Sequence, residues 1–385
     1  MMVTGVYHPE TTGASLQCRQ LVQRLRDRVD FVVLTTTFDR DLPASDEVDG
    51  VEVWRVPVHP DGLGSNLGAA VSMTRAFFRL RHRFDILHLH GFSQKSILLA
   101  ALARASGKRV VIKLTSVGHD DPMSMRQRGG AAFWFYRRAD CLVGVSPRFE
   151  RTYRDAGMPP ARYRFIPNAV DANRFRPAAA GEVTALRRHL GLPPDDPVIL
   201  FVGFFSHEKR PDLLYEAWSA LADEGLRSTL VLVGATRSPY YEIDGSMADA
   251  MRADAERRGL GRQVTFVERT AEIEKYYRAA DIFVLPTLRE GLPNVLLEAM
   301  GSGVPPLITR LEGITDWVVE HGRNGLLVPA NDGPALTREL RALLQDRGWR
   351  EALGRAARAS VEQRFAPDVV AEQMFELYTT GYFGS

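Results

Sequence analysis

The sequence predicts an α/β protein built from two parallel-sheet domains, and three observations support this fold class. Strand-like apolar runs alternate with helical patterns along almost the whole chain, which is typical of βαβ units. The chain has 385 residues, which is more than one ordinary core holds. A proline-rich break near residues 168–197 separates two halves of similar size. Since open parallel sheets bind ligands at the carboxyl ends of their strands, we expect both sheets to aim their loops into one cleft.

The elements follow in order along the chain. In the first half, short runs rich in Val, Ile and Leu predict strands at residues 3–7, 31–36, 51–56, 86–90, 110–115, 141–145 and 163–166. Apolar residues at helical spacing predict helices at 15–25, 67–83, 95–105 and 125–138. In the second half, strands are expected at 198–202, 229–234, 264–267, 282–286 and 306–309. Its helices are expected at 211–224, 247–258, 273–279, 293–301 and 335–344.

These elements set the expected domain boundaries. Residues 1–175 form the first domain, and residues 176–365 form the second. The tail, residues 366–385, is helical and amphipathic, so we expect it to pack back on the first domain.

The composition excludes several classes of protein. A hydrophobic content of 45% and a charged content of 25% describe a globular chain. Lys and Arg total 49 against 47 Asp and Glu, so the net charge of +2 gives no sign of nucleic-acid binding. The two cysteines have no metal-binding spacing and fit a cytoplasmic setting. There is no signal-peptide pattern and no apolar stretch near the roughly 18–20 residues of a membrane span. The first strand is short for a buried one, so a start further upstream stays open.

The segment from residue 288 to 303 is the most informative part of the chain. Glu290 and Glu298 flank a Gly-x-Pro turn that opens onto an apolar helix. Pro293 suits the first helical position, and the backbone amides of the first turn, around Asn294, form a positive helix end that can bind an anion. Two acids around such a site match a ligand with a central diphosphate and a polyhydroxyl group at each end, as in a nucleotide-sugar. The alternative is that both acids are ordinary residues near a helix end.

A second basic segment follows the first strand of the second half. Lys209 and Arg210 lie in its loop, where they could neutralise a diphosphate. Only five of the 49 basic residues are lysines, so Lys209 is not the default surface cation of this chain. A solvated pair of cations is the alternative.

Polar side chains also end three strands of the first half. A glycine loop at Gly13 leads from the first strand to a helix, and it is either a phosphate or sugar contact or a plain turn. His90 ends a buried strand and is expected to look out of the carboxyl edge, with His88 on the same face; a hydrogen-bonded core histidine is the alternative. His119, Asp120 and Asp121 follow another strand, where they either hold sugar hydroxyls or form an Asp-Pro turn.

Together these segments resemble the retaining glycosyltransferases of family four, which have the GT-B architecture of two Rossmann-like domains. The resemblance runs from about residue 2 to 365, and its most specific element is the E-G-x-P-x-x-x-x-E block from Glu290 to Glu298. Ile166-Pro-Asn-Ala-Val-Asp171 with Phe175, Ala280-Asp281 with Pro286, and Asn324-Gly-Leu-Leu-Val328 also fit the family pattern.

The resemblance implies roles for several residues. Glu298 would bind the ribose hydroxyls, Glu290 would face the donor sugar, and Lys209 would bind phosphate. The donor would also contact Gly13 and the backbone of the turn at Gly291, Leu292, Pro293 and Asn294. Pro293 has no amide hydrogen, so it would contribute no hydrogen bond from its nitrogen. Three departures stand out: Phe204 replaces the usual arginine, Thr12-Gly13 replaces a glycine pair, and His119 is only the nearest counterpart of the sugar-contacting histidine. Arg210, where a glycine is common, is a candidate substitute for the missing arginine.

The implied reaction is retaining transfer of a hexosyl group from a UDP-, GDP- or ADP-sugar. It passes through an oxocarbenium-like ion pair, with Glu290, Lys209 and His119 as the candidate catalytic residues. His90, Asp120 and Asp121 are candidates on the acceptor side, and the acceptor is a glycan, a lipid-linked molecule or a small molecule. We expect no metal, no cofactor beyond the nucleotide-sugar co-substrate, and no nucleic-acid partner.

Alternatives remain at this stage. One is a sugar-nucleotide-binding subunit with weakened catalysis, and another is a GT-B-fold epimerase or phosphorylase. Aromatic and arginine residues also mix at residues 75–84 and 134–138, as on a surface that touches an anionic membrane; core aromatics backed by solvated arginines are the other interpretation.

Overall fold

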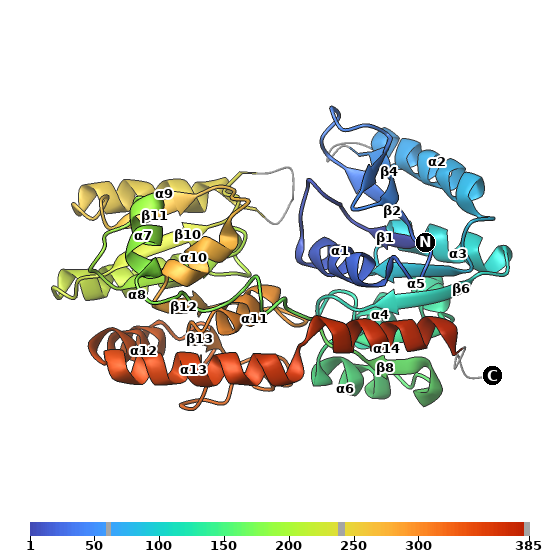
Figure 1. Ribbon diagram of the computed structural model, residues 1–385. Helices are drawn as coiled ribbons and strands as arrows, with labels where there is room; N and C mark the ends of the chain where they lie inside the picture. Colours follow the sequence, from blue (N-terminus) through green and yellow to red (C-terminus); the bar gives the residue numbers. More distant parts are fainter. Residues whose placement is uncertain (59–62, 238–242, 381–385) are drawn as a thin grey trace. The chain divides into compact units, whose positions relative to one another are not determined.

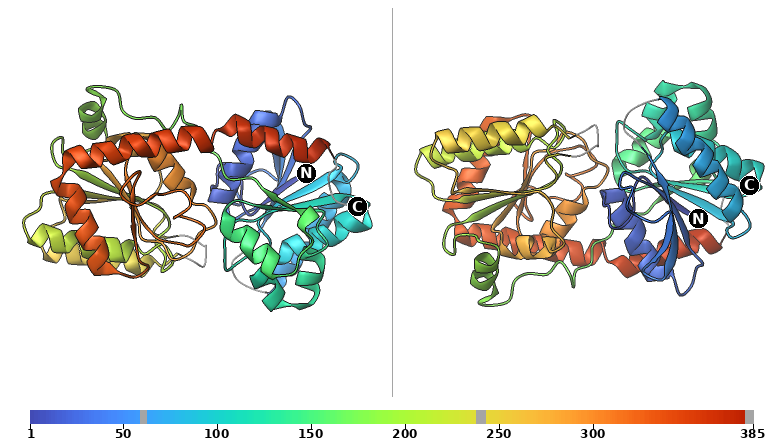
Figure 2. Two further views of the ribbon diagram at one scale, coloured as in Figure 1. Left: turned by 90° about the horizontal axis from the view of Figure 1, so that it is seen from below. Right: turned by 90° about the horizontal axis from the view of Figure 1, so that it is seen from above.

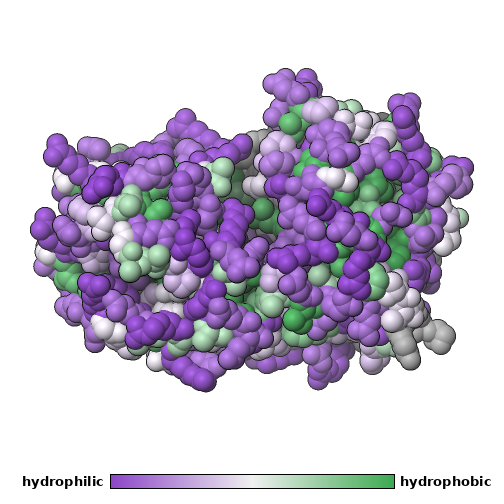
Figure 3. Space-filling model, in the orientation of Figure 1, coloured by the Kyte–Doolittle hydropathy of each residue, from purple (hydrophilic) through white to green (hydrophobic). Residues whose placement is uncertain are grey.

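The computed structural model describes residues 1–58, 63–237 and 243–380, which form two α/β units (Figure 1). Unit 1 comprises Met1–Ala169 and Pro367–Ser385, and unit 2 comprises Val170–Ala366. The division between them falls six residues before the boundary expected from the sequence. Figure 3 shows one face of the molecule, on which hydrophilic residues predominate and hydrophobic areas lie between them.

The sheet of unit 1 has eight strands in the order β3-β4-β2-β1-β5-β6-β7-β8. All neighbouring pairs are parallel except β3 and β4. The antiparallel edge strand β3 was not predicted, because its sequence, Ser-Asp-Glu-Val, lacks an apolar run. The strands are β1 Met2–Thr4, β2 Val32–Thr37, β3 Ser45–Val48, β4 Val51–Pro57, β5 Ile86–His90, β6 Arg109–Lys113, β7 Cys141–Gly144 and β8 Tyr163–Phe165.

Helices cover both faces of this sheet (Figure 2). The single helix predicted at residues 125–138 is in fact two helices, because Gly129 and Gly130 have φ angles of 62° and 60°. The helices are α1 Gly13–Leu25, α2 Leu63–Leu80, α3 Gln94–Ala105, α4 Pro122–Arg128, α5 Gly130–Tyr136, α6 Pro147–Asp155 and α14 Pro367–Thr379, with a 3₁₀ turn at Pro160–Arg162.

Helix α14 packs against α1 and completes the core of unit 1 (Figure 2). Val370, Met374 and Tyr378 of α14 lie in the same buried cluster as Cys18 and Val22 of α1. Ion pairs border this contact on the outside: Arg24 reaches Asp368 at 2.6 Å, and Arg28 reaches Glu372 at 2.6 Å. The last helix is therefore a structural part of the first unit.

The sheet of unit 2 has six parallel strands in the order β11-β10-β9-β12-β13-β14. They are β9 Val198–Val202, β10 Thr229–Val233, β11 Val264–Val267, β12 Ile282–Leu285, β13 Pro306–Thr309 and β14 Leu326–Val328. The helices are α7 Glu182–His189, α8 Pro211–Asp223, α9 Gly245–Arg257, α10 Ile273–Ala279, α11 Asn294–Gly301, α12 Gly333–Gln345 and α13 Arg347–Arg364. The sequence pattern did not show β14, α7 or α13, and α7 lies inside the segment expected to be a linker.

Candidate active site

Two loops at the carboxyl edge of the unit 2 sheet bring the predicted lysine and acid together. Lys209 lies between β9 and α8, and Glu290 lies between β12 and α11; β9 and β12 are neighbours in the sheet. The Nζ atom of Lys209 donates to Oε1 of Glu290 at 2.6 Å. Their side chains are 24% and 11% exposed, so the pair is partly screened from water and still reachable.

Backbone contacts hold these two loops together. The amide of Leu288 donates to the carbonyl oxygen of Glu208 at 2.7 Å, and the buried hydroxyl of Thr287 donates to the same oxygen at 3.2 Å. An ion pair between Arg289 and Glu208, at 2.7 Å, adds a side-chain link. The spacing of Lys209 and Glu290 is therefore set by the scaffold, which favours a preorganised charge pair.

The loop that carries Lys209 begins at a close backbone approach. Gly234, which follows β10, has a φ of +155°, and a Cβ atom there would lie 1.8 Å from the carbonyl oxygen of Gly203. Only glycine fits at residue 234, so the chain can turn directly out of the sheet at this edge.

Arg210 follows Lys209 and occupies a left-handed conformation, with φ at 53°. Glycine adopts this conformation at no steric cost, which explains why the resembling family commonly has glycine here. The guanidinium of Arg210 donates from Nε to the carboxylate of Asp212 at 3.0 Å and from Nη1 to Asn331. Arg210 is thus engaged within its own unit, and Phe204, which stands in the usual arginine position, is half-buried.

Helix α11 begins one residue later than the sequence suggested. Pro293 is its N-cap, with φ at −69° and ψ at 119°, and Asn294 is the first helical residue. Gly291, Leu292 and Pro293 are buried, so the turn before the helix is tightly packed. The positive end of the helix dipole consequently lies in the segment directly after Glu290.

Glu298 lies further along α11 and is half-buried. Its Oε2 accepts a hydrogen bond of 3.0 Å from the hydroxyl of Tyr277, a fully buried residue of α10. Burial raises the pKa of Glu298 to about 7, while the bond from Tyr277 and the charge of Arg174 act in the opposite direction. Glu298 thus has a partner on a neighbouring helix. The partner itself was missed, because nothing in the local pattern marks a residue 21 positions earlier.

In unit 1, Gly13 is the exposed first residue of α1. Thr12 caps this helix, and a reciprocal pair of bonds joins Thr12 and Ser15. The glycine loop therefore leads into a properly capped helix start.

His119, Asp120 and Asp121 lie in the turn between β6 and α4, and the two acids serve the turn itself. Buried Asp120 accepts from the amides of Thr115 and Ser116, each at 2.9 Å. Asp121 caps α4 by accepting from the amide of Met123 at 3.1 Å. These bonds hold the loop that carries half-buried His119, so both carboxylates stabilise the turn.

The expectation that His90 looks out of the sheet edge is wrong, because its side chain is only 7% exposed. Its ring lies 4.4 Å from that of His88, which confirms that the two share a face of the strand. His88 Nδ1 lies 2.6 Å from the hydroxyl of Tyr378, whereas within the described chain neither ring nitrogen of His90 has a hydrogen-bond partner. Burial, first of all, lowers the pKa of both histidines. It also lowers the pKa of Lys113, which is opposite His90 in β6, to about 8.

The described residues contain no group of three or more His, Cys, Asp or Glu arranged to hold a metal ion. No helix in the same residues is both long and apolar enough to cross a bilayer.

Comparison with known proteins identifies the class to which this fold and site belong. The chain matches the glycosyl transferase 4-like domain over residues 12–169 and the glycosyl transferases group 1 over residues 182–360. It is 30% identical, over 358 residues, to a D-inositol 3-phosphate glycosyltransferase of Xylanimonas cellulosilytica, covering 87% of this chain and 83% of the relative.

Solved structures of the same architecture agree. A sucrose-phosphate synthase from Thermosynechococcus elongatus superposes with a TM-score of 0.81 at 22% identity, covering 100% of this chain and 99% of the other. Anabaena Alr3699/HepE, solved with UDP-glucose, gives 0.77 at 20% identity and covers 98% of both chains. The class is therefore that of the glycosyltransferases with the GT-B fold. More particularly, the chain belongs to the family of the glycosyl transferases group 1.

Proposed function

We propose that the protein transfers a hexosyl group from a nucleotide-diphosphate sugar, with retention of the anomeric configuration. The observation that carries this proposal is the Lys209–Glu290 pair, held at 2.6 Å at a sheet edge directly before the amino end of α11. A cation and a helix dipole at one place suit a diphosphate, and an acid beside them suits a sugar that carries hydroxyl groups. The nucleotide-sugar is a UDP-, GDP- or ADP-sugar.

Each part of the donor has a proposed partner. Glu298 accepts hydrogen bonds from the ribose hydroxyls, and Lys209 with the first-turn amides of α11 binds the diphosphate. Glu290 faces the sugar. Gly13 of unit 1 allows close backbone approach to the donor, as the resemblance implies. The HepE structure, which was solved in complex with UDP-glucose, supports a donor of this kind.

The bond between the anomeric carbon and the diphosphate oxygen breaks, and the positive charge that develops on the sugar stays close to the departing diphosphate. Lys209 and the α11 dipole stabilise the negative charge that builds on that leaving group. The acceptor hydroxyl attacks from the same side, and its proton passes to the departing phosphate oxygen. His119 contacts the sugar in this scheme, from a loop that Asp120 and Asp121 hold in place.

The acceptor is a glycan, a lipid-linked molecule or a small molecule. The name of the Xylanimonas relative, an inositol phosphate glycosyltransferase, supports the small-molecule class. A peripheral contact with an anionic membrane fits the exposed face of α5. There Trp134 is 48% exposed and has the guanidinium of Arg138 3.7 Å from the centre of its ring.

A second candidate function is a sugar-nucleotide-binding subunit with weakened catalysis. Phe204 in place of the arginine supports it, because one leaving-group cation is then lacking. Donor hydrolysis or transfer distinguishes the two functions, since a binding subunit holds the donor without turnover.

A calorimetric binding screen with UDP-, GDP- and ADP-glucose tests the donor site. We expect one nucleotide to bind, and Glu298→Ala and Lys209→Ala each to weaken binding by about 10- to 100-fold, as for the loss of a charge-assisted contact. Lys108→Ala, which removes a lysine of unit 1 paired with Asp85, is the matched control. If no nucleotide-sugar binds, or if both variants bind like the parent, the donor-site assignment fails.

A further inference from the structure

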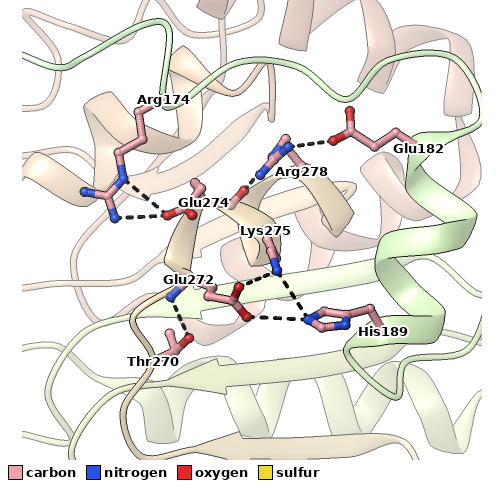
Figure 4. A network of polar contacts seen from close by, with 8 residues as sticks. All are labelled: Arg174, Glu182, His189, Thr270, Glu272, Glu274, Lys275 and Arg278. Atoms are coloured by element: carbon pink, nitrogen blue, oxygen red, sulfur yellow. Dashed lines mark hydrogen bonds and ion pairs between the residues drawn. The ribbon is translucent and has the colours of Figure 1, made fainter.

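Helix α10 is fastened at several points to the segment that begins unit 2 (Figure 4). Glu274 pairs with Arg174 at 3.0 Å, and Arg278 pairs with Glu182 of α7 at 2.6 Å. Towards the start of the helix, Lys275 and Glu272 form a further cluster with His189. These contacts fix the rotation of α10 about its own axis, and so they fix where its inward-facing side chain lies.

That inward-facing side chain is Tyr277, whose ring packs edge-on against Phe175 with ring centres 5.7 Å apart. Its hydroxyl reaches Oε2 of Glu298 at 3.0 Å and the carbonyl oxygen of Val295 at 3.3 Å. Burial raises the pKa of Tyr277 well above its usual value, so the phenol keeps its proton and donates to the ionised carboxylate. Tyr277 is thus a fixed donor to the carboxylate of Glu298, which the proposed function assigns to the ribose hydroxyls.

We propose that Tyr277 is a positioning residue that holds Glu298 in the orientation and the ionised form that bind the ribose hydroxyls. The proposal rests on the proposed function, because it takes Glu298 as the ribose ligand. It adds that α10, a helix without a predicted donor contact of its own, influences donor binding through Glu298.

The groups around Glu298 decide whether its pKa is raised or lowered. Burial, as the largest cause, and the charge of Glu274 raise the pKa of Glu298, the hydrogen bond from Tyr277 and the charge of Arg174 lower it, and together these effects raise the pKa to about 7. On the side of α13, Arg358 donates to the carbonyl oxygens of Gly301, Ala172 and Phe175, at the far end of α11 from the donor. A protonated Glu298 can accept less well from two hydroxyls, so nucleotide affinity should fall as the pH drops through neutrality.

The test measures the dissociation constant of the nucleotide that the wild type binds (UDP, GDP or ADP), from about pH 5.5 to about pH 9, a range that spans the titration of Glu298. Tyr277→Phe should move the midpoint of the pH profile upward, with an affinity loss of about 3- to 10-fold at pH 7 that shrinks at high pH. Glu274→Gln should move the midpoint downward, because Arg174 then acts on Glu298 without a competing acid. Glu272→Gln, at the N-cap of the same helix but in the His189 cluster, is the control and should leave the profile unchanged.

Two results would overturn the positioning role. One is a Tyr277→Phe profile that keeps the wild-type midpoint, whether or not affinity falls equally at every pH. The other is a Glu274→Gln midpoint that does not move downward, because the pH profile would then not report the ionisation of Glu298 that Tyr277 is proposed to hold. The second variant keeps its buried tyrosine, so it tests the proposal even if Tyr277→Phe fails to fold. Failure of the proposed function would look different, since Glu298→Ala would then bind the nucleotide like the wild type.

Discussion

The two units treat the polar side chains at their sheets differently. In unit 2, Lys209 and Glu290 pair charge with charge and stay partly exposed. In unit 1, His88 and His90 are buried without a carboxylate partner, and burial favours their neutral form. Unit 2 thus has a pair of opposite charges at its sheet edge, whereas unit 1 buries two histidines in their neutral form. Buried histidines make their unit sensitive to acid, because protonation is easier in the unfolded chain than in the folded unit.

The largest expected effect is a loss of the folding stability of unit 1 in acid. The unfolded chain takes up protons on both histidines below about pH 6.5, while the folded unit resists them, so stability is present above that pH and is lost as the pH falls. At pH 5 the loss reaches up to about 2 kcal/mol for each histidine. The loss is measured by urea unfolding at pH 8 and pH 5, with hydrogen exchange of unit 1 amides as the probe.

His90→Gln should flatten this acid dependence, because a glutamine has no proton to gain. His207→Gln is the control in unit 2, since the side chain of His207 is 80% exposed. An unchanged acid slope in His90→Gln would show that other groups cause the loss.

A smaller effect on stability is expected in unit 2, at Arg210. Replacement by alanine or by glycine removes the same contacts with Asp212 and Asn331, so the difference between the two variants isolates the backbone conformation. Because φ is +53°, Arg210→Gly should be more stable than Arg210→Ala by about 1 kcal/mol. Thermal unfolding of both variants measures the difference, and equal stabilities would show that the left-handed conformation costs nothing here.

The smallest effect concerns the exposed surface of unit 1. Vesicles of phosphatidylglycerol and phosphatidylcholine should retain the protein in a sedimentation assay at low salt, and Trp134→Ala should reduce retention several-fold. Neutral phosphatidylcholine vesicles should retain little of it. Trp349→Ala, in α13 of unit 2, is the control. Equal retention by Trp134→Ala, or none by either type of vesicle, would remove the membrane contact from the proposal.

Much of the fold could be predicted because parallel strands buried on both faces appear as short apolar runs. The runs that became β9, β10 and β12 needed no tertiary information. The edge strand β3 could not be found this way, since a solvated edge carries no apolar signal. The break between α4 and α5 could have been predicted from Gly129 and Gly130, because two consecutive glycines favour a turn.

The candidate site was predictable in part for a related reason. Glu290 and Lys209 each follow a strand, and neighbouring strands of a parallel sheet deliver such residues to one edge. Tyr277 bonds to Glu298, and the charge of Arg174 acts on it, from segments with no fixed spacing to it, so only the fold reveals them. His90 was misplaced because strand alternation gives a side chain its face and says nothing about what covers that face.

Helix α14 has a consequence for the order in which the protein is made. It supplies Tyr378 to His88 and several side chains to the core of unit 1, yet it follows all of unit 2 in the chain. During synthesis, unit 2 is complete on the ribosome before unit 1 has received its final helix. Until α14 is made, the apolar face of unit 1 that it covers stays exposed. A nascent chain stalled within unit 2 would therefore present this face to chaperones.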